Sequence, residues 1–456
     1  MSQRPKVLRS ERKIIGAFEQ VNPNAAGIDV GSREHWVSVP EDRTDQPVQK
    51  FGTFTEDLYE MADWLVSCGV DTIAMEATGV YWIPLFEILE RRGLNPRLIN
   101  ARSIGRRNKK KTDVLDCQWA RQLHTFGLLD PAFRPDDQIG VLRSYLRHRR
   151  MLIEYASDHI RHMQKALDLM NLKLHTVISD ITGVTGQRII RSILAGQRDP
   201  KVLASMRDTK CKNSEETIEK ALTGNYRDEH LFALRHAVEL FDDYQAKLVD
   251  CDQKIEELLN TFDKKVNPPS PPPAKKTSRR NKNQPRFDGR SLLHQIAGVD
   301  LVAIDGLEIS SVLTITSETG FDMSPWPTDG HFTSWLALCP NRHITGGKPI
   351  PGRKYNPAPN RAAQAFRLAA RSLERSQSAL GAFYRRIKAR YGRAVAIKAT
   401  AHKLARIFYA MLNNLTEYQD DGAEYYEKKY RERIIKSLER KALTFGLQLI
   451  PMEAVH

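Results

Sequence analysis

AAGIDVGS at residues 25–32 and DTIAME at residues 71–76 are the two stretches that decide the fold of the first part of this chain. Each is a largely apolar run of strand length; Asp29 lies within the first, and Glu76 ends the second. The pattern of apolar and polar residues around them predicts further strands at 36–39, 48–54 and 96–100. Helices are predicted at 55–68, 81–92 and 112–126. The first part of the chain is therefore predicted to be an α/β domain.

The order of these elements points to one architecture. Three strands of antiparallel type come first, and helix, strand, helix, strand and helix follow. This is the order of a ribonuclease H-like domain, an inference that rests on analogy between folds. Thr55 and Thr112 stand where two of the helices begin and are predicted to cap them.

The rest of the chain is predicted to be mostly α-helical. Before residue 263, apolar residues recur at spacings of three and four, as in a short coiled coil. They are Phe241, Tyr244, Leu248, Cys251, Ile255, Leu258 and Phe262. One helix cannot bury such a stripe alone, so the partner is either another helix of the chain or a second copy. Self-association is favoured.

A proline-rich segment divides the chain. Residues 264–290 hold nine basic residues and one acid. They are predicted to form an extended linker that either follows a phosphate backbone or is a solvated tether. The predicted parts are a basic N-terminal arm at 1–20, a ribonuclease H-like catalytic domain at 21–130, a helical and coiled-coil region at 131–262, a basic proline-rich linker at 263–290 and a C-terminal domain at 291–456.

Composition narrows the class of protein. The chain has 456 residues, of which 41% are hydrophobic, which is enough for several ordinary cores. No uncharged apolar stretch of about 18 residues occurs, so no membrane span is expected. The five cysteines include no CxxC pair, which disfavours a zinc knuckle or a disulfide framework. We expect a reducing, cytoplasmic location.

The charge balance suggests a polyanionic partner. Lys and Arg number 70 against 55 Asp and Glu, a formal net charge of +15. Such an excess is common in proteins that bind nucleic acid. A second basic stretch lies at 143–165. The densest cluster, whose residues are candidate phosphate contacts, consists of Arg102, Arg106, Arg107, Lys109, Lys110 and Lys111.

Four acids of the first domain form a candidate metal site. Asp29 and Glu76 lie in or at the end of apolar strands, while Asp113 and Asp116 are three residues apart and share a helix face. Carboxylates that converge repel one another unless a cation is present. Hard divalent cations, Mg²⁺ first, bind such oxygen ligands and act on phosphodiesters. Taken singly, a turn or cap explains Asp29, and a solvated helix face explains the other pair.

GIDVG at 27–31, EATGVYW at 76–82 and NKKKTDVLDCQWA at 108–120 resemble the DEDD transposases of the insertion-sequence-110 family. The resemblance continues after the linker. LLHQIAGVDLVAIDGL at 292–307 is similar to the family's "IPGIG" segment, and FTSWLALCPNRHITGGK at 332–348 to its serine–glycine–glycine motif. The ordered combination is specific, although each piece alone is not.

The resemblance implies a function and a set of site residues. Members are DNA recombinases that excise and insert their own element, guided by a structured "bridge" RNA, and they act as dimers and tetramers. Asp29, Glu76, Asp113 and Asp116 match the four acids that hold Mg²⁺. Thr345 takes the position of the serine nucleophile, which forms a covalent link to DNA. Lys348, three residues later, is a candidate phosphate contact.

Two other functions stay open at this point. A catalytically silent, nucleic-acid-binding relative of the recombinases is favoured only by threonine at the nucleophile position. An ATP-using enzyme of the actin and sugar-kinase type also begins with a strand like GIDVG. That class needs further glycine-rich loops, which the sequence lacks, and it leaves the basic charge unexplained.

Overall fold

The computed structural model describes residues 19–77, 79–99, 112–266, 282–340, 344–345, 348–349 and 360–450. The chain divides into two compact units, residues 1–134 and 135–456. The candidate arm at 1–18 and most of the predicted linker lie outside the described residues. The domain bounds proposed from the sequence therefore remain predictions.

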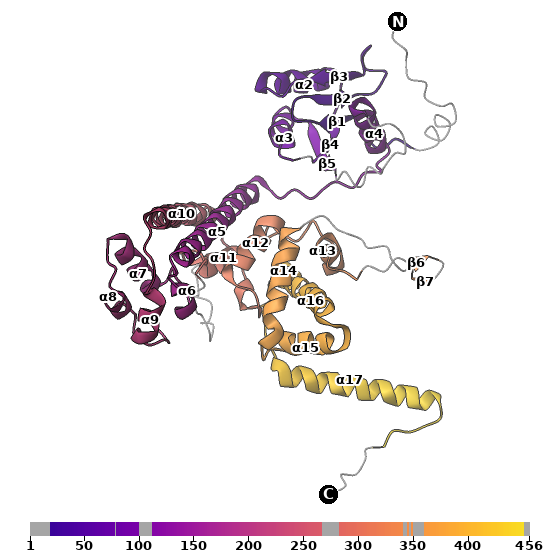
Figure 1. The fold of residues 1–456 in the computed structure, drawn as a ribbon. Coiled ribbons are helices and arrows are strands. Elements are labelled where there is room, and N and C mark those ends of the chain that lie inside the picture. Colours follow the sequence, from indigo (N-terminus) through magenta and orange to yellow (C-terminus); the bar gives the residue numbers. More distant parts are fainter. Residues whose placement is uncertain are drawn as a thin grey trace. The chain divides into compact units, whose positions relative to one another are not determined.

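The first unit contains a mixed five-stranded sheet (Figure 1). Its strands are β1 (Ala25–Val30), β2 (His35–Ser38), β3 (Val48–Phe51), β4 (Thr72–Glu76) and β5 (Asn95–Ile99), in the order β3-β2-β1-β4-β5. The β1–β2 and β2–β3 pairs are antiparallel, whereas β1–β4 and β4–β5 are parallel. The expected α/β class is confirmed, and the carboxyl ends of β1, β4 and β5 meet at one edge of the sheet.

Helices cover both faces of the sheet (Figure 1). On one face α2 (Thr55–Ser67) and α3 (Trp82–Arg91) bury the main apolar core, which includes Ile28, Ile73 and Leu65. On the other face α4 (Asp113–Thr125) packs on β1, β2 and β4. Residues alternate between the two faces along each strand, so the face of each acid follows from its position.

Gly27 lets α4 approach the sheet closely. A Cβ atom at this position would lie 2.3 Å from the carbonyl oxygen of Cys117 and 2.4 Å from the backbone nitrogen of Arg121. Both atoms belong to the backbone of α4 and cannot swing aside. The glycine of the GIDVG stretch therefore sets the distance between α4 and β1.

The two predicted helix caps had different outcomes. Thr112 is the N-cap of α4, and its hydroxyl accepts a hydrogen bond from the backbone of Leu115 at 3.4 Å. The prediction for Thr55 was wrong, because Phe54 is the N-cap of α2. The Asp57 carboxylate accepts from the Phe54 backbone N–H at 3.0 Å, so the capping oxygen comes from inside the first turn.

The second unit begins with a pair of long helices, α5 (Asp137–Leu169) and α10 (Asp228–Asn260). They are antiparallel, since Gln138 bonds Thr261 near one end and Tyr155 stacks near Tyr244 further along. Between them in the chain come α6 (Leu174–Val177), α7 (Val184–Leu194), α8 (Pro200–Ser205) and α9 (Glu215–Leu222), which share an apolar core with the two long helices.

The apolar stripe of α10 packs on α5 of the same chain. Phe241, Leu248 and Ile255 are buried, and α5 is the main neighbour of α10. The stripe therefore packs against another helix of the same chain. This was the less favoured of the two alternatives. The stripe gives no argument for an oligomer, whose existence remains a prediction from the resemblance.

The remaining helices form the C-terminal part of the second unit (Figure 1). They are α11 (Gly289–Ala297), η1 (Leu301–Ala303), α12 (Ile309–Thr319), α13 (Asp329–Trp335), α14 (Arg361–Ser372), η2 (Leu373–Arg375), α15 (Ala379–Tyr391), α16 (Arg393–Asn414) and α17 (Gly422–Thr444). Two short strands, β6 (Ile344–Thr345) and β7 (Lys348–Pro349), pair antiparallel. The expected mostly helical second half is confirmed.

The end of the predicted linker is attached to the long helices. The buried Arg149 of α5 binds the buried Asp252 of α10, with Nε and Oδ1 2.5 Å apart. Arg149 also donates to the carbonyl of Asn283 at 3.0 Å, and the Arg286 backbone N–H donates to Asp252 at 3.1 Å. One buried ion pair therefore fixes the segment that leads into α11.

Candidate active site

Asp29 and Glu76 lie side by side on one face of the sheet. The parallel register pairs Ile28 of β1 with Met75 of β4, so Asp29 and Glu76 follow as the next neighbours. Adjacent strands are about 4.8 Å apart, and neighbours in register point to the same face. Both side chains are half-buried. The backbone alone thus brings the two strand acids together, as the sequence predicted.

The other two acids lie on α4, the helix that packs on that same face of the sheet. Asp113 and Asp116 occupy the first turn of α4, the helix that Gly27 admits onto β1. Asp116 is half-buried and Asp113 is exposed. A helix N-terminus by itself stabilises acids, so their position alone does not assign a metal role. The packing does show that α4 contacts β1 and β4, the strands that carry Asp29 and Glu76.

The four carboxylates do not form a closed ligand cluster. Among the described ranges, no group of three or more His, Cys, Asp or Glu side chains is arranged to hold a metal ion. The donor set nevertheless suits Mg²⁺, which binds through a few carboxylates and keeps several waters. Two half-buried acids on neighbouring strands also gain from a compensating cation. The structure therefore supports the position of the site, while the ligand roles remain predictions.

The Cys117 thiol of α4 interacts electrostatically with the Asp29 carboxylate of β1. Burial, and secondly the nearby carboxylate of Asp29, raise the pKa of the Cys117 thiol to about 12. The thiol is therefore protonated at neutral pH and suits neither a nucleophile nor a metal ligand. The influence of Asp29 agrees with the register, which puts this acid on the face that α4 covers.

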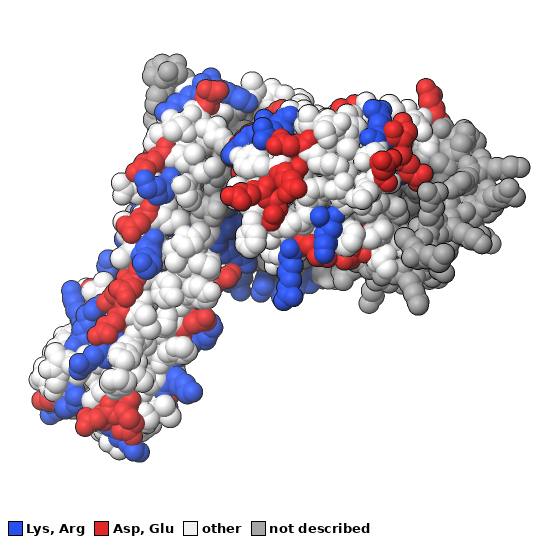
Figure 2. Space-filling view, turned by 90° about the horizontal axis from the view of Figure 1, so that it is seen from above, with Lys and Arg blue, Asp and Glu red and all other residues white. Residues whose placement is uncertain are grey.

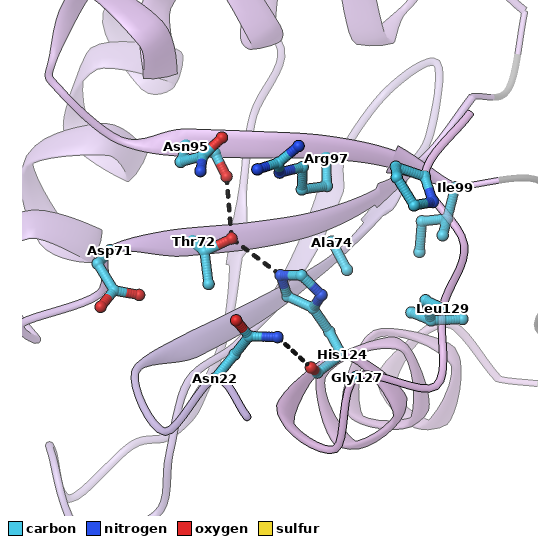
Figure 3. A pocket seen from close by; sticks show the side chains of 11 residues that line it. Asn22, Asp71, Thr72, Ala74, Asn95, Arg97, Ile99, His124, Gly127 and Leu129 are labelled. Atoms are coloured by element: carbon cyan, nitrogen blue, oxygen red, sulfur yellow. Dashed lines mark hydrogen bonds between the residues drawn. The ribbon is translucent and has the colours of Figure 1, made fainter. Parts of the chain in front are cut away.

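A cavity of about 510 Å³ lies on the same face, over β4 and β5 (Figure 3). It is lined by alternate strand residues, Thr72 and Ala74 from β4 and Asn95, Arg97 and Ile99 from β5. The helix α4 packs on β1 and β2 more than on β4, which leaves this part of the sheet open. Ile99, the register partner of Glu76, also lines the cavity, so the cavity extends from Thr72 toward the end of β4 that carries Glu76.

His124 forms one wall of the cavity. Its Nε2 lies 2.9 Å from the Thr72 hydroxyl, which itself donates to the carbonyl of Asn95 at 3.1 Å (Figure 3). The hydroxyl has one proton, so Nε2–H donates to Thr72. Burial, and then Arg97, lower the pKa of His124. The histidine is thus a neutral, hydrogen-bonded group that packs α4 against β4.

The comparison with protein families gives a direct result for this unit. Residues 26–172 match the model of the DEDD transposases of the insertion-sequence-110 family, which is described as a transposase. The match covers the sheet except for Ala25, and the whole of α4 and α5. Residues 26–172 form a DEDD transposase domain of this family. None of the curated proteins compared with the chain matches it.

The assignment removes one of the functions that the sequence left open. The transposase domain is that of a catalytic enzyme, and the process it implies is DNA transposition. The actin and sugar-kinase alternative is therefore set aside. A divalent metal and a DNA partner follow from the same family at this level of detail. Every described helix is too short or too polar to span a lipid bilayer.

The predicted nucleophile of the transposase lies in the short hairpin of the second unit. Thr345 in β6 pairs with Lys348 in β7. The two glycines between them lie outside the described residues. The structure thus places the backbone of Thr345 and Lys348 at neighbouring positions, and the roles of their side chains remain predictions.

The predicted phosphate contacts of the transposase are not tested. Arg102, Arg106, Arg107, Lys109, Lys110 and Lys111 all lie outside the described residues. On the face shown in Figure 2, basic and acidic side chains are interspersed rather than gathered in one patch. The net charge of +15 therefore does not by itself define a binding surface.

The second basic stretch, on α5, is partly used to hold helices together. Arg143 donates to the carbonyls of Ser317 and Glu318 at the end of α12, at 3.0 and 3.1 Å. Arg147 binds the Glu318 carboxylate at 2.9 Å, and Arg149 is the buried partner of Asp252. Three of the six Arg and Lys side chains of this stretch thus join α5 to other helices.

Sequence reasoning missed the cavity and the role of Gly27. Asn95 and Arg97 alternate with apolar residues in β5, a pattern that marks one polar face of a buried strand. That signal was present in the sequence. The close approach of α4 to Gly27 was not visible, because it depends on which helix packs on β1.

Proposed function

We propose that the transposase excises an insertion sequence and inserts it elsewhere by Mg²⁺-dependent strand exchange. Asp29, Glu76, Asp113 and Asp116 are the metal ligands in this proposal. It is supported by the family match of residues 26–172 and by the register that sets Asp29 beside Glu76. The register is the single observation that carries the assignment, because it is fixed by backbone hydrogen bonds.

The acids and their surroundings have separate tasks in this proposal. Bound Mg²⁺ would supply Lewis-acid stabilisation of negative charge on the phosphodiester. The strand acids fix the ligand oxygens on a rigid sheet, and Gly27 seats α4, whose first turn carries Asp116, closely on β1. Cys117, held neutral, adds no charge beside them. The described residues thus provide an acidic edge on a rigid scaffold.

The Thr345 hydroxyl is proposed to be the nucleophile. Its oxygen attacks the phosphorus of a DNA phosphodiester, and a covalent bond forms between them. The bond from phosphorus to the leaving deoxyribose oxygen breaks, and that oxygen gains a proton while the threonine hydroxyl loses one. Lys348, its partner in the hairpin register, is placed to neutralise a phosphate oxygen.

The remaining parts of the proposal concern partners. A structured guide RNA selects the element ends and the target, and the basic cluster at 102–111 contacts phosphates. The transposase acts as a dimer or tetramer, in the bacterial or archaeal cytoplasm at the nucleoid. These statements rest on the resemblance of the motifs and on the charge of the chain.

The acids are tested by Asp29→Asn and Asp116→Asn in a strand-exchange assay on element-end DNA. We expect both variants to lose strand exchange while RNA binding persists, because neutral amides hold Mg²⁺ weakly. Asp63→Asn is the matched control, since Asp63 is an exposed α2 acid that pairs with Arg92 at 3.0 Å. Full activity of Asp29→Asn or Asp116→Asn would refute the metal assignment.

The nucleophile is tested by trapping the covalent protein–DNA adduct. Thr345→Ala is expected to abolish the adduct, whereas Thr345→Ser keeps or increases it because the hydroxyl remains and the methyl group is lost. Ser334, exposed on α13, provides the control Ser334→Ala. An adduct that survives in Thr345→Ala but not in Ser334→Ala moves the nucleophile to Ser334. Cleavage seen only in Thr345→Ser identifies this copy as catalytically silent.

A further inference from the structure

Two cations lie over aromatic rings where α15, α16 and α17 meet, and a third cation, Arg433, lies near them. The Arg386 guanidinium of α15 lies 3.9 Å from the ring centre of Tyr430 and 5.4 Å from those of Phe383 and Tyr426. The Lys403 ammonium of α16 lies 4.9 Å from the ring centre of Phe383 and 5.3 Å from that of Tyr426. We call Arg386, Lys403 and Arg433 of α17 the cation cluster.

The cation cluster has no anion of its own. In the described part of the chain, none of its three members forms an ion pair. The Nε atom of Arg386 is buried and has no hydrogen-bond partner among the described residues. Burial, then Arg386, then Arg433 lower the pKa of Lys403. No carboxylate contributes to that shift, so the repulsion is uncompensated.

This differs from the other cations of the C-terminal helices. On the same helix as Arg386, Lys388 binds Glu374; Arg393, at the start of α16, lies 3.8 Å from the same carboxylate. On α16, Arg406 binds Asp329. The chain therefore supplies carboxylates to neighbouring cations but not to the cluster. Three like charges in a partly buried place are costly without a counter-anion.

We propose that the cation cluster binds a phosphate group of a nucleic-acid backbone. The aromatic rings carry Arg386 and Lys403 on their faces, so they hold the cations in place instead of stacking with bases. Contact is then with phosphate alone and is independent of base sequence. Arg433 is exposed and extends the cluster to solvent. The proposal deepens the proposed function and rests on it for the choice of polyanion.

A structural role is the competing explanation. The cation–π contacts also join α17 to α15, and no residue of α17 is buried. If docking were their only purpose, removal of charge would not alter nucleic-acid binding. Arg433 separates the two roles, because it makes none of these ring contacts.

The test measures the salt dependence of binding by the full-length chain. Probes are a 30-base-pair DNA duplex and an RNA hairpin of the same phosphate number, and variants are Arg433→Gln and Lys403→Met. Each lost phosphate contact is expected to reduce the slope of log K against log salt by about 0.9 on duplex DNA, or about 0.7 on a single strand. The probe whose slope falls identifies the polyanion.

Lys247→Met is the matched control, because Lys247 is exposed on α10 and its loss also removes one charge. Its slope is expected to stay near that of the wild type. The slope is measured without strand exchange, so failure of strand exchange and failure of this proposal are distinguishable. Wild-type slopes for Arg433→Gln on both probes would overturn the proposal, whatever Lys403→Met does to α17.

Discussion

The sheet of the first unit and the long helices of the second arrange charged side chains in opposite ways. In the sheet, backbone register gathers the like charges of Asp29 and Glu76 on one face. On α5, a run of cations that looks like a nucleic-acid surface is paired with carboxylates, as Arg149 is with Asp252. Like charges that the backbone brings together indicate a candidate binding site. A run of like charges in the sequence can instead serve to hold helices together.

The strongest test of this contrast is Asp252→Ala. The change leaves the Arg149 guanidinium buried without its carboxylate and also removes the acceptor of the Arg286 backbone. Breaking a buried pair in this way costs about 3–5 kcal/mol. We expect amide hydrogen exchange in α5 and α10 to speed up accordingly.

Asp242→Ala supplies the matched comparison. Asp242 pairs with Arg191 at 2.6 Å, but both side chains are about half exposed, at 43% and 52%. Exposed pairs contribute about 0–1 kcal/mol, so exchange is expected to change little. If Asp252→Ala were as mild as Asp242→Ala, the view that the α5 cations are structural would be wrong.

A second test addresses the sheet, where backbone packing places the acids. Gly27→Ala puts a methyl group against the backbone of Cys117 and Arg121. Overpacking of this kind costs about 1–3 kcal/mol. We expect faster hydrogen exchange in α4 and a loss of strand exchange, since Asp116 moves with its helix.

Gly140→Ala on α5 is the control for Gly27→Ala. A Cβ atom at Gly140 meets nothing within 4 Å, and alanine favours helix over glycine by about 0.5–1 kcal/mol. A slight gain in stability is expected. Gly27→Ala would contradict the proposed seating of α4 if it too left exchange in α4 unchanged or slower.

The smallest expected effect is the pH dependence of the free energy of unfolding that His124 contributes. Because burial lowers the pKa of His124, the unfolded chain takes up a proton on this side chain before the folded protein does. The stability it contributes is therefore present above the unfolded pKa of about 6.5 and is lost as the pH falls toward the folded value.

His124→Gln removes this titration. The difference in free energy of unfolding between wild type and variant is expected to shrink between pH 7.5 and pH 5.5, measured by hydrogen exchange in β4 and α4. A difference that grows over this range would mean that the folded state favours the protonated imidazole. His124 would then be charged in the cavity instead of neutral.

The sequence predicted much of the sheet because the local signals agree there. Strand length, the alternation around Asp29 and Glu76, and the Thr112 cap all carry their information within a few residues. The cap of α2 was mistaken, because a threonine before a helix and an aspartate inside its first turn give competing signals. The third strand ends at Phe51, three residues before the predicted bound.

The helical unit was harder to predict because its contacts join distant parts of the chain. The stripe of α10 needed a partner, but nothing local indicated α5, about 100 residues earlier. Likewise, nothing near Arg149 in the sequence indicates that this cation of a basic run pairs with Asp252. The cation cluster joins residues from three helices, none of which is distinctive alone.

By itself, the sequence determined that this chain is an α/β domain followed by helices, and that residues 26–172 form a DEDD transposase domain. Both are written in short segments and in their order. Only the tertiary structure decided which charges are paired, how closely α4 approaches Gly27, and where cations meet without a carboxylate. Those outcomes depend on packing between residues far apart in the chain, and no local pattern specifies such packing.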